Sequence, residues 1–330
     1  MSFPLIALLL ALLACFVVGR SANPLMRKVP PAQAVPLVTV AALAVSLAAG
    51  VALTAIAIAV IAGLSSVAAD GRWSAAELRT EVPIPWWLGA LAAAVVLALL
   101  ARAAVRTARI VVALVRADRL CRIMRAGGGP IVMVDDDSAD AFTVAGLRGC
   151  VVISRRLFAG LRADERRVLT AHELSHLTRR HHLFVHLADI ASAANPLLTT
   201  VSGAVRFGVE RWADEDAAVG IGDRRRTGRA LARVALLRSS LAAARPTLPS
   251  SSMPNGSSRS AGIPALGVAT QQVMPRVQAL LNPAPRRRTV RLLAAGAVAF
   301  GVLIVGMASL DHIHEAIETA TPYVHHVIHR

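Results

Sequence analysis

A long stretch without charge constrains the fold of this chain more than any other feature. From Pro36 to about Leu64 there is no Asp, Glu, Lys or Arg. A helix of this length can cross the roughly 30 Å hydrocarbon core of a lipid bilayer. Three further apolar runs cover residues 3–18, 85–103 and 290–311. The sequence therefore predicts four transmembrane helices.

The composition supports a membrane protein over a nucleic-acid-binding protein. Hydrophobic residues make up 55% of the chain and charged residues only 17%, which is too apolar for an ordinary soluble domain. The net charge of +16 could suggest a nucleic-acid partner. However, aromatic residues are scarce and the arginines lie beside the apolar runs, as the positive-inside rule describes. We therefore expect no direct contact with nucleic acid.

The charges flanking the apolar runs predict how the chain crosses the membrane. Arg20, Arg27 and Lys28 follow the first run, whereas a secretory signal carries its basic residues before the apolar run. A looser alternative is a lipoprotein cleavage site ending at Cys15, which the missing basic start disfavours. The third run is followed by a dense group of basic residues: Arg102, Arg106, Arg109, Arg116, Arg119, Arg122 and Arg125. We predict a multi-pass protein of the bacterial cell membrane with both termini outside and residues 102–291 in the cytoplasm.

Residues 170–177, inside the large cytoplasmic connection, read Thr-Ala-His-Glu-Leu-Ser-His-Leu and contain an H-E-x-x-H motif. On a helix, His172 and His176 lie on one face at positions i and i+4, and Glu173 projects beside them. A catalytic zinc site takes three protein ligands and keeps one position for water. The motif therefore provides two ligands and a base, and the third ligand must come from elsewhere. A second acidic motif follows, in which Glu210 and Asp214 share a helix face.

Around these motifs the sequence predicts a small mixed domain. Residues 131–134 and 150–153 are short β-rich runs, and residues 157–182 form a helical block that carries the H-E-x-x-H motif. Helices are also expected at residues 224–244 and 271–281. The apolar stretch at 183–209 leaves three alternatives open, which are a re-entrant segment, an interfacial segment and a buried helix pair.

Five segments together resemble membrane-anchored, gluzincin-like metallopeptidases: residues 141–144, 151–154, 172–176, 210–214 and the Asn-Pro-Leu sequence at 195–197. Two groups share this layout, the BlaR/MecR-type antirepressor peptidases and the HtpX/CAAX-prenyl-protease type. The four spans and the Asn-Pro-Leu segment are more similar to the BlaR/MecR type. Only twenty residues follow Leu310, so we expect no penicillin-binding sensor domain and no direct acylation by β-lactams.

The resemblance implies a fold class and a domain layout. The fold is mainly α, with four transmembrane helices and a cytoplasmic α+β, zincin-like peptidase domain that contains a small β-sheet. Residues 1–116 hold three spans (3–18, 36–64 and 85–103), and residues 117–289 form the peptidase domain. Residues 290–311 form the fourth span, and residues 312–330 form a short extracytoplasmic tail.

The resemblance also implies the site. His172, His176 and Glu210 would be Zn²⁺ ligands, and Asp214 would accept a hydrogen bond from a ligand histidine and so fix its tautomer. Glu173 would be the catalytic base that takes a proton from water during attack on a peptide carbonyl. His181 and His182 are interpreted as polar residues at a helix end. No other cofactor is expected.

The resemblance implies a zinc endopeptidase that cleaves a cytoplasmic protein, with a winged-helix, BlaI-like transcriptional repressor as the expected partner in a signalling pathway. The alternatives are an HtpX-like quality-control protease and a non-catalytic transducer braced by zinc. The tail is rich in histidine (His312, His314, His325, His326 and His329), which suggests an amphipathic tail on the bilayer or, alternatively, a metal-sensing or pH-sensing segment. The stimulus, the cleavage site and the oligomeric state do not follow from the sequence.

Overall fold

The predicted fold class is confirmed: the protein is mainly helical, with four candidate membrane-spanning helices and a small mixed three-stranded sheet. The computed structural model describes residues 2–125, 128–135, 140–144, 146, 149–243, 266–283 and 289–321. The chain forms two compact units. The first contains Met1–Ile110, Phe184–Val205 and Arg287–Arg330, and the second contains Val111–Leu183 and Arg206–Arg286.

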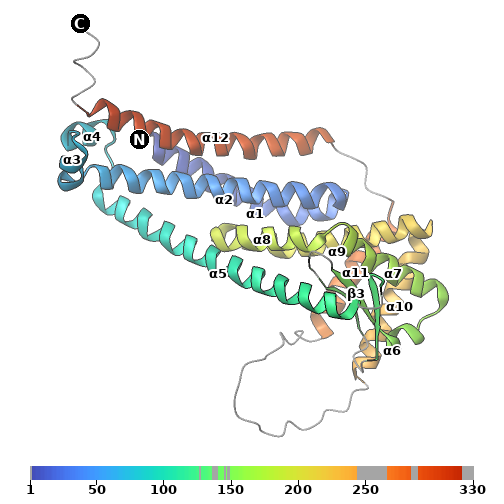
Figure 1. Ribbon diagram of the computed structural model, residues 1–330. Helices are drawn as coiled ribbons and strands as arrows, with labels where there is room; N and C mark the ends of the chain where they lie inside the picture. The colour runs from blue at the N-terminus through green and yellow to red at the C-terminus, as the bar shows by residue number, and fades with distance from the viewer. Residues whose placement is uncertain are drawn as a thin grey trace. The chain divides into compact units, whose positions relative to one another are not determined.

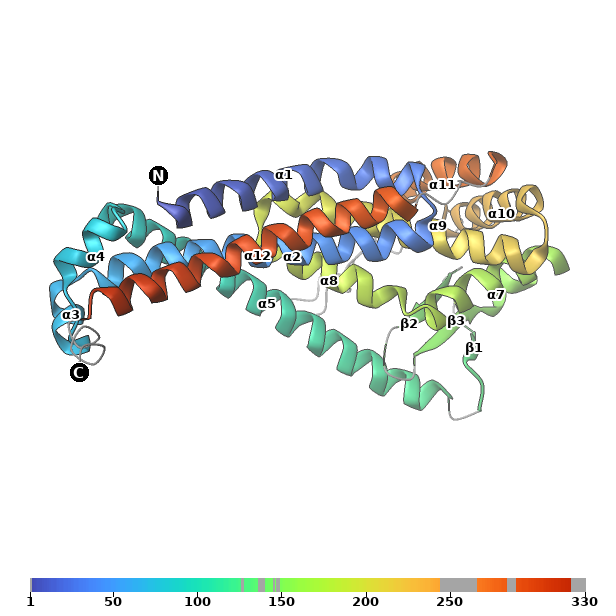
Figure 2. The ribbon, with the colours of Figure 1, turned by 90° about the horizontal axis from the view of Figure 1, so that it is seen from above.

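Four helices of the chain are long and apolar enough to cross a membrane. They are α1 (Phe3–Lys28), α2 (Pro31–Ala62), α5 (Trp86–Met124) and α12 (Thr289–Thr319, apolar from Gly296). In the first unit, α1, α2 and α12 lie side by side (Figures 1 and 2). Helix α5 runs well past the predicted span end at residue 103, because the arginine-rich segment that follows is also a good helix former.

Small residues hold the helices of the first unit together. Ten alanines of α2 are buried, and five of them have no exposed surface: Ala34, Ala42, Ala48, Ala52 and Ala55. A Cβ atom at Gly306 of α12 would lie 3.1 Å from the backbone Cα of Ala48 in α2. Membrane helices associate through such small residues, because these let two backbones approach closely where burial from water offers no driving force.

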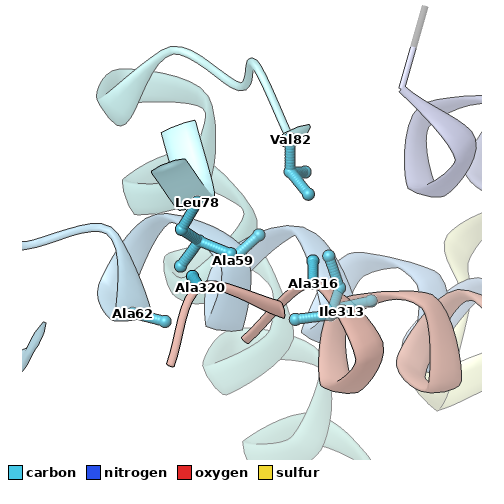
Figure 3. Packing of buried hydrophobic residues seen from close by; sticks show 8 residues of the cluster. Ala59, Ala62, Leu78, Val82, Ile313, Ala316 and Ala320 are labelled. Atoms are coloured by element: carbon cyan, nitrogen blue, oxygen red, sulfur yellow. The ribbon is translucent and has the colours of Figure 1, made fainter. Parts of the chain in front are cut away.

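One end of this bundle is closed by two short helices, α3 (Ser65–Gly71) and α4 (Ala75–Glu81). Figure 3 shows the apolar cluster there, with Leu78 of α4 and Val82 after it lying over alanines of α2 and α12. The cluster is formed by Ala55, Ala59, Ala62, Leu78, Val82, Ile313, Ala316 and Ala320. The indole N–H of Trp73 donates to the carbonyl of Ala62 (2.9 Å) and ties the connection to the end of α2.

The first unit also contains residues Phe184–Val205, which include most of α8 (His181–Ala194), the 3₁₀ turn η2 (Pro196–Leu198) and the start of α9 (Thr199–Ile221). The Asn195 side chain donates to Cys15 Sγ at 3.1 Å, and Thr200 Oγ1 donates to the carbonyl of Gly19 at 2.8 Å. Asp189 is buried and accepts hydrogen bonds from Arg106 and Ser202. Of the alternatives for residues 183–209, these contacts favour a buried helix pair packed on α1.

The second unit contains a sheet in the order β1-β3-β2, built from β1 (Ile131–Val134), β2 (Ala141–Val144) and β3 (Cys150–Ser154). Strand β3 is buried throughout and pairs parallel to β1 and antiparallel to β2. One face packs on α7 (Ala163–Thr178) and α10 (Arg224–Ala243), with Val151, Leu169 and Val234 in one core cluster. The opposite face is covered by the end of α5 through Cys121 and Met124.

The predicted helical block at 157–182 is helical, but it is not one continuous helix. It is divided into α6 (Arg155–Ala159), α7 and the start of α8. Helix α7 begins after Arg162, whose N–H donates to the Glu165 carboxylate at 2.9 Å, and it ends at Thr178 before Arg180 enters the left-handed region at φ 52°. The predicted helix at 271–281 is part of α11 (Leu266–Leu281). Of the histidine-rich tail, residues 325, 326 and 329 lie outside the described residues.

Candidate metal centre

Helix α7 places both histidines of the H-E-x-x-H motif on the same face. His172 and His176 are one turn apart, and their Nε2 atoms are 3.2 Å from each other. The helix is held from two sides, because Leu169 packs toward the sheet while Val168 packs toward α10 and α11. The first histidine is therefore buried and the second half-buried, and neither ring can turn freely toward solvent.

Helix α9 brings Glu210 to the same point. One carboxylate oxygen lies 3.7 Å from His172 Nε2, and the other lies 3.5 Å from His176 Nε2. One ligand atom from each of the three residues lies within 4.8 Å of the others. The three residues that the sequence singles out as metal ligands are thus brought together from two helices, with Glu210 34 positions after His176 in the chain.

The spacing of these atoms fits a tetrahedral metal ion. Zinc binds imidazole nitrogen and carboxylate oxygen at about 2.0–2.2 Å, so two ligand atoms of a tetrahedron are roughly 3.3–3.6 Å apart. The observed separations of 3.2, 3.5 and 3.7 Å lie close to that edge length. Two neutral imidazoles and one carboxylate are also a donor set that zinc accepts in catalytic sites. The residues present therefore fit a zinc ion.

Asp214 supports His172 from the side away from this cluster. Its Oδ1 lies 3.0 Å from His172 Nδ1, and the Asp214 side chain is almost fully buried. Burial alone would lower the pKa of His172, but Asp214 and Glu210 outweigh it and raise the pKa to about 9. A carboxylate behind a ligand histidine fixes the ring orientation and makes the facing nitrogen a better donor to a metal.

Arg276 of α11 completes the centre, and the sequence analysis missed it. One guanidinium nitrogen lies 2.7 Å from the Glu210 carboxylate, and two others donate to the two oxygens of Asp214, each at 2.7 Å. Burial raises the pKa values of Glu210 and Asp214, but the guanidinium outweighs it, and the pKa of Glu210 falls well below its usual range. Arg276 is the single charged residue of the predicted helix 271–281, but a lone arginine does not by itself indicate a buried partner.

Glu173 lies beside the cluster with one partner on the sheet. Thr143 Oγ1 of β2 donates to Glu173 Oε2 at 3.0 Å and also lies 2.9 Å from the Glu173 carbonyl. Burial raises the pKa of Glu173, because the carboxyl has little solvent around it. Arg238 of α10 is 3.9 Å away and donates to the backbone carbonyl of Ala141 at 2.6 Å. The expected base is therefore oriented by the edge strand of the sheet.

The two histidines after the motif differ in their surroundings. His181 is buried, with its Nδ1 3.1 Å from Nδ1 of His176 and its ring 4.9 Å from that of Trp212. Burial lowers the pKa of His181 to about 3 and that of His176 to about 4. His181 starts α8, as expected of a helix-end residue, but its side chain is buried, which the sequence did not predict. His182 is only partly buried.

Comparison with known proteins agrees with this arrangement. Residues 116–222 match the model of peptidase family M48. No curated protein and no solved structure matches the chain. The matched region contains the sheet, α7 and the stretch of α9 that carries Glu210, and it ends before α11. Together with the four apolar helices, this similarity suggests a membrane metallopeptidase, and it does not single out the BlaR/MecR type.

Proposed function

We propose that this protein is an integral-membrane zinc endopeptidase whose catalytic domain faces the cytoplasm. The observation that carries the proposal is the convergence of His172, His176 and Glu210, with Glu173 next to His172 in the motif and in electrostatic interaction with His172 and Glu210. A purely structural zinc site needs no such base, and structural sites are closed by a fourth protein ligand. Among the described residues, the cluster offers three ligand residues. This donor set therefore favours catalysis over bracing.

In peptide hydrolysis, a bound zinc ion and the side chains of the protein would have different roles. A bound zinc ion would supply Lewis acidity and lower the pKa of water to about 7. Glu173 takes a proton from the attacking water as the new C–O bond forms at the peptide carbonyl carbon. It then passes that proton to the amide nitrogen as the C–N bond breaks, so that the amine leaves neutral. Thr143 holds the Glu173 carboxylate in place for both transfers.

The sheet gives a reason to expect a polypeptide substrate. Strand β2 pairs with β3 on one side only, within the part of the chain that the structure describes. A free strand edge binds an extended peptide through its main-chain hydrogen bonds. Because Thr143 of β2 lies 3.0 Å from the Glu173 carboxylate, a peptide added along β2 would pass the base.

We propose that the substrate is a cytoplasmic protein, and that it is a winged-helix repressor in a signalling pathway. This part of the proposal rests on the resemblance of the four spans and the Asn195-Pro196-Leu197 segment to BlaR/MecR-type peptidases. The M48 match does not decide between a repressor and a damaged membrane protein as the substrate. Quality control therefore stays the alternative that an experiment must separate.

The test compares wild type with Glu173→Gln, using Glu81→Gln as a control for the same chemical change at an exposed site. Each protein is purified in detergent, its zinc is quantified, and it is incubated with a repressor encoded beside the gene or with labelled, unfolded casein. We expect zinc in all three proteins and a 10²–10⁴-fold slower cleavage by Glu173→Gln alone. Fragments are identified by mass spectrometry.

The outcomes separate the three functions. Cleavage of the repressor alone supports signalling, and cleavage of casein alone supports quality control. Zinc in every protein with cleavage of neither substrate would favour the non-catalytic transducer. Equal cleavage by wild type and Glu173→Gln would refute the assignment of the base.

A further inference from the structure

His181 lies behind the second zinc ligand, in the same way that Asp214 lies behind the first. Its Nδ1 is 3.1 Å from Nδ1 of His176, and the two rings meet edge to face, with centroids 4.9 Å apart and planes at 85°. The corresponding distance from His172 Nδ1 to Asp214 Oδ1 is 3.0 Å. Both proposed ligands thus have a buried partner on the ring nitrogen that faces away from the cluster.

The geometry excludes His181 as a further ligand of the same ion. His176 presents Nε2 to the cluster, at 3.2 Å from His172 and 3.5 Å from Glu210. The two nitrogens of an imidazole point in different directions, so a group at Nδ1 cannot reach an ion held at Nε2. In agreement, the metal-ligating group contains His172, His176 and Glu210 but not His181.

The contact between His176 and His181 determines which ring nitrogen of each histidine carries the proton. A neutral imidazole that gives Nε2 to a metal carries its proton on Nδ1, which is then a hydrogen-bond donor. The Nδ1 of His181 must therefore be the acceptor, so the proton of that ring is on its own Nε2. This Nε2 is buried and has no hydrogen-bond partner among the described residues.

The backbone is shaped to bring His181 to this position. Only Arg179 and Arg180 separate α7 from α8. Arg180 has φ 52°, in the left-handed region that costs a residue with a side chain roughly 1–2 kcal/mol. The turn leads the chain back so that the first residue of α8 lies under the last histidine of the motif. On the other side, the Trp212 ring packs 4.9 Å from the His181 ring.

We propose that His181 is a positioning residue for zinc: its Nδ1 accepts the Nδ1–H of His176 and fixes the tautomer and orientation of that ligand. The inference rests on the zinc site proposed above. One ligand histidine would thus be held by an anionic partner, Asp214, and the other by a neutral partner. Groups that orient ligand histidines are typically worth 10–100-fold in metal affinity.

The test measures the zinc affinity of the full-length protein in detergent by competition with a chelator. His181→Phe keeps a ring but removes the acceptor, and His181→Asn keeps an acceptor oxygen in a smaller side chain. His182→Phe makes the same change at the next position, where the residue is outside the cluster. We expect zinc binding to weaken 10–100-fold in His181→Phe, to recover to within a few-fold in His181→Asn, and to be unchanged in His182→Phe.

A second measurement separates positioning from folding. The thermal unfolding midpoint of each metal-free protein is compared, because a purely structural His181 would lower it in both His181 variants. Zinc affinity of wild-type strength in His181→Phe would overturn the inference, as would equal losses in His181→Phe and His181→Asn. A wild type that binds no zinc would instead refute the zinc site itself, so the two failures are distinguishable.

Discussion

The interiors of the two units differ in what fills most of their contacts, although the first unit also buries a charged group, Asp189, paired with Arg106. In the first unit, alanine and glycine fill the contacts between long helices, as at Gly306 and Ala48. In the second, the deepest contacts include charged groups, with Arg276 placed between Glu210 and Asp214. Close packing of small residues needs no charge partner, whereas a buried charge must be paired. The stability of the second unit therefore depends on a few particular side chains.

The largest loss of stability is expected when the buried cation of the second unit, Arg276, is removed. Arg276→Met leaves the buried carboxylate of Asp214 and the partly exposed carboxylate of Glu210 without their shared partner, and breaking a buried pair costs about 3–5 kcal/mol. We expect a large fall in the thermal stability of the metal-free peptidase domain, followed by thermal unfolding in detergent with a chelator present. The control is Arg225→Met, at an exposed position one residue into α10, which should change stability by less than about 0.5 kcal/mol. If Arg276→Met were as stable as the control, the charge network would be incidental.

A smaller loss of stability is expected from a substitution at Gly306, where α12 and α2 approach each other closely. Gly306→Ala places a Cβ 3.1 Å from the Ala48 Cα and carbonyl oxygen, both of which belong to a helix backbone that cannot move aside alone. Overpacking of this kind costs about 1–3 kcal/mol. Gly301→Ala, on the same helix, meets nothing within 4 Å and should be neutral. Thermal unfolding of both variants in detergent measures the difference, and equal stability would show that α2 and α12 do not pack as closely as described.

The sequence predicted what depends on local pattern. The four spans follow from apolar length, and the pairing of His172 with His176 follows from helical spacing. It did not predict the role of Arg276, because 62 positions separate that residue from Asp214 and a single arginine on a helix does not reveal its partner. It also did not predict that His181 is buried, because that burial depends on the turn at Arg180, where an arginine adopts a conformation that propensity disfavours. Contacts between residues that are far apart in the sequence therefore could not be predicted from the local sequence pattern.

The most direct test of the account is the zinc content of wild type and of Glu210→Gln, measured by mass spectrometry of the metal after gel filtration. Glu210→Gln keeps the size of the side chain but removes the anionic ligand, while Asp216→Asn makes the same change on α9 outside the cluster. The account predicts about one zinc ion per chain in wild type and in Asp216→Asn, and a severe loss in Glu210→Gln. A wild type without zinc, or full zinc in Glu210→Gln, would contradict it.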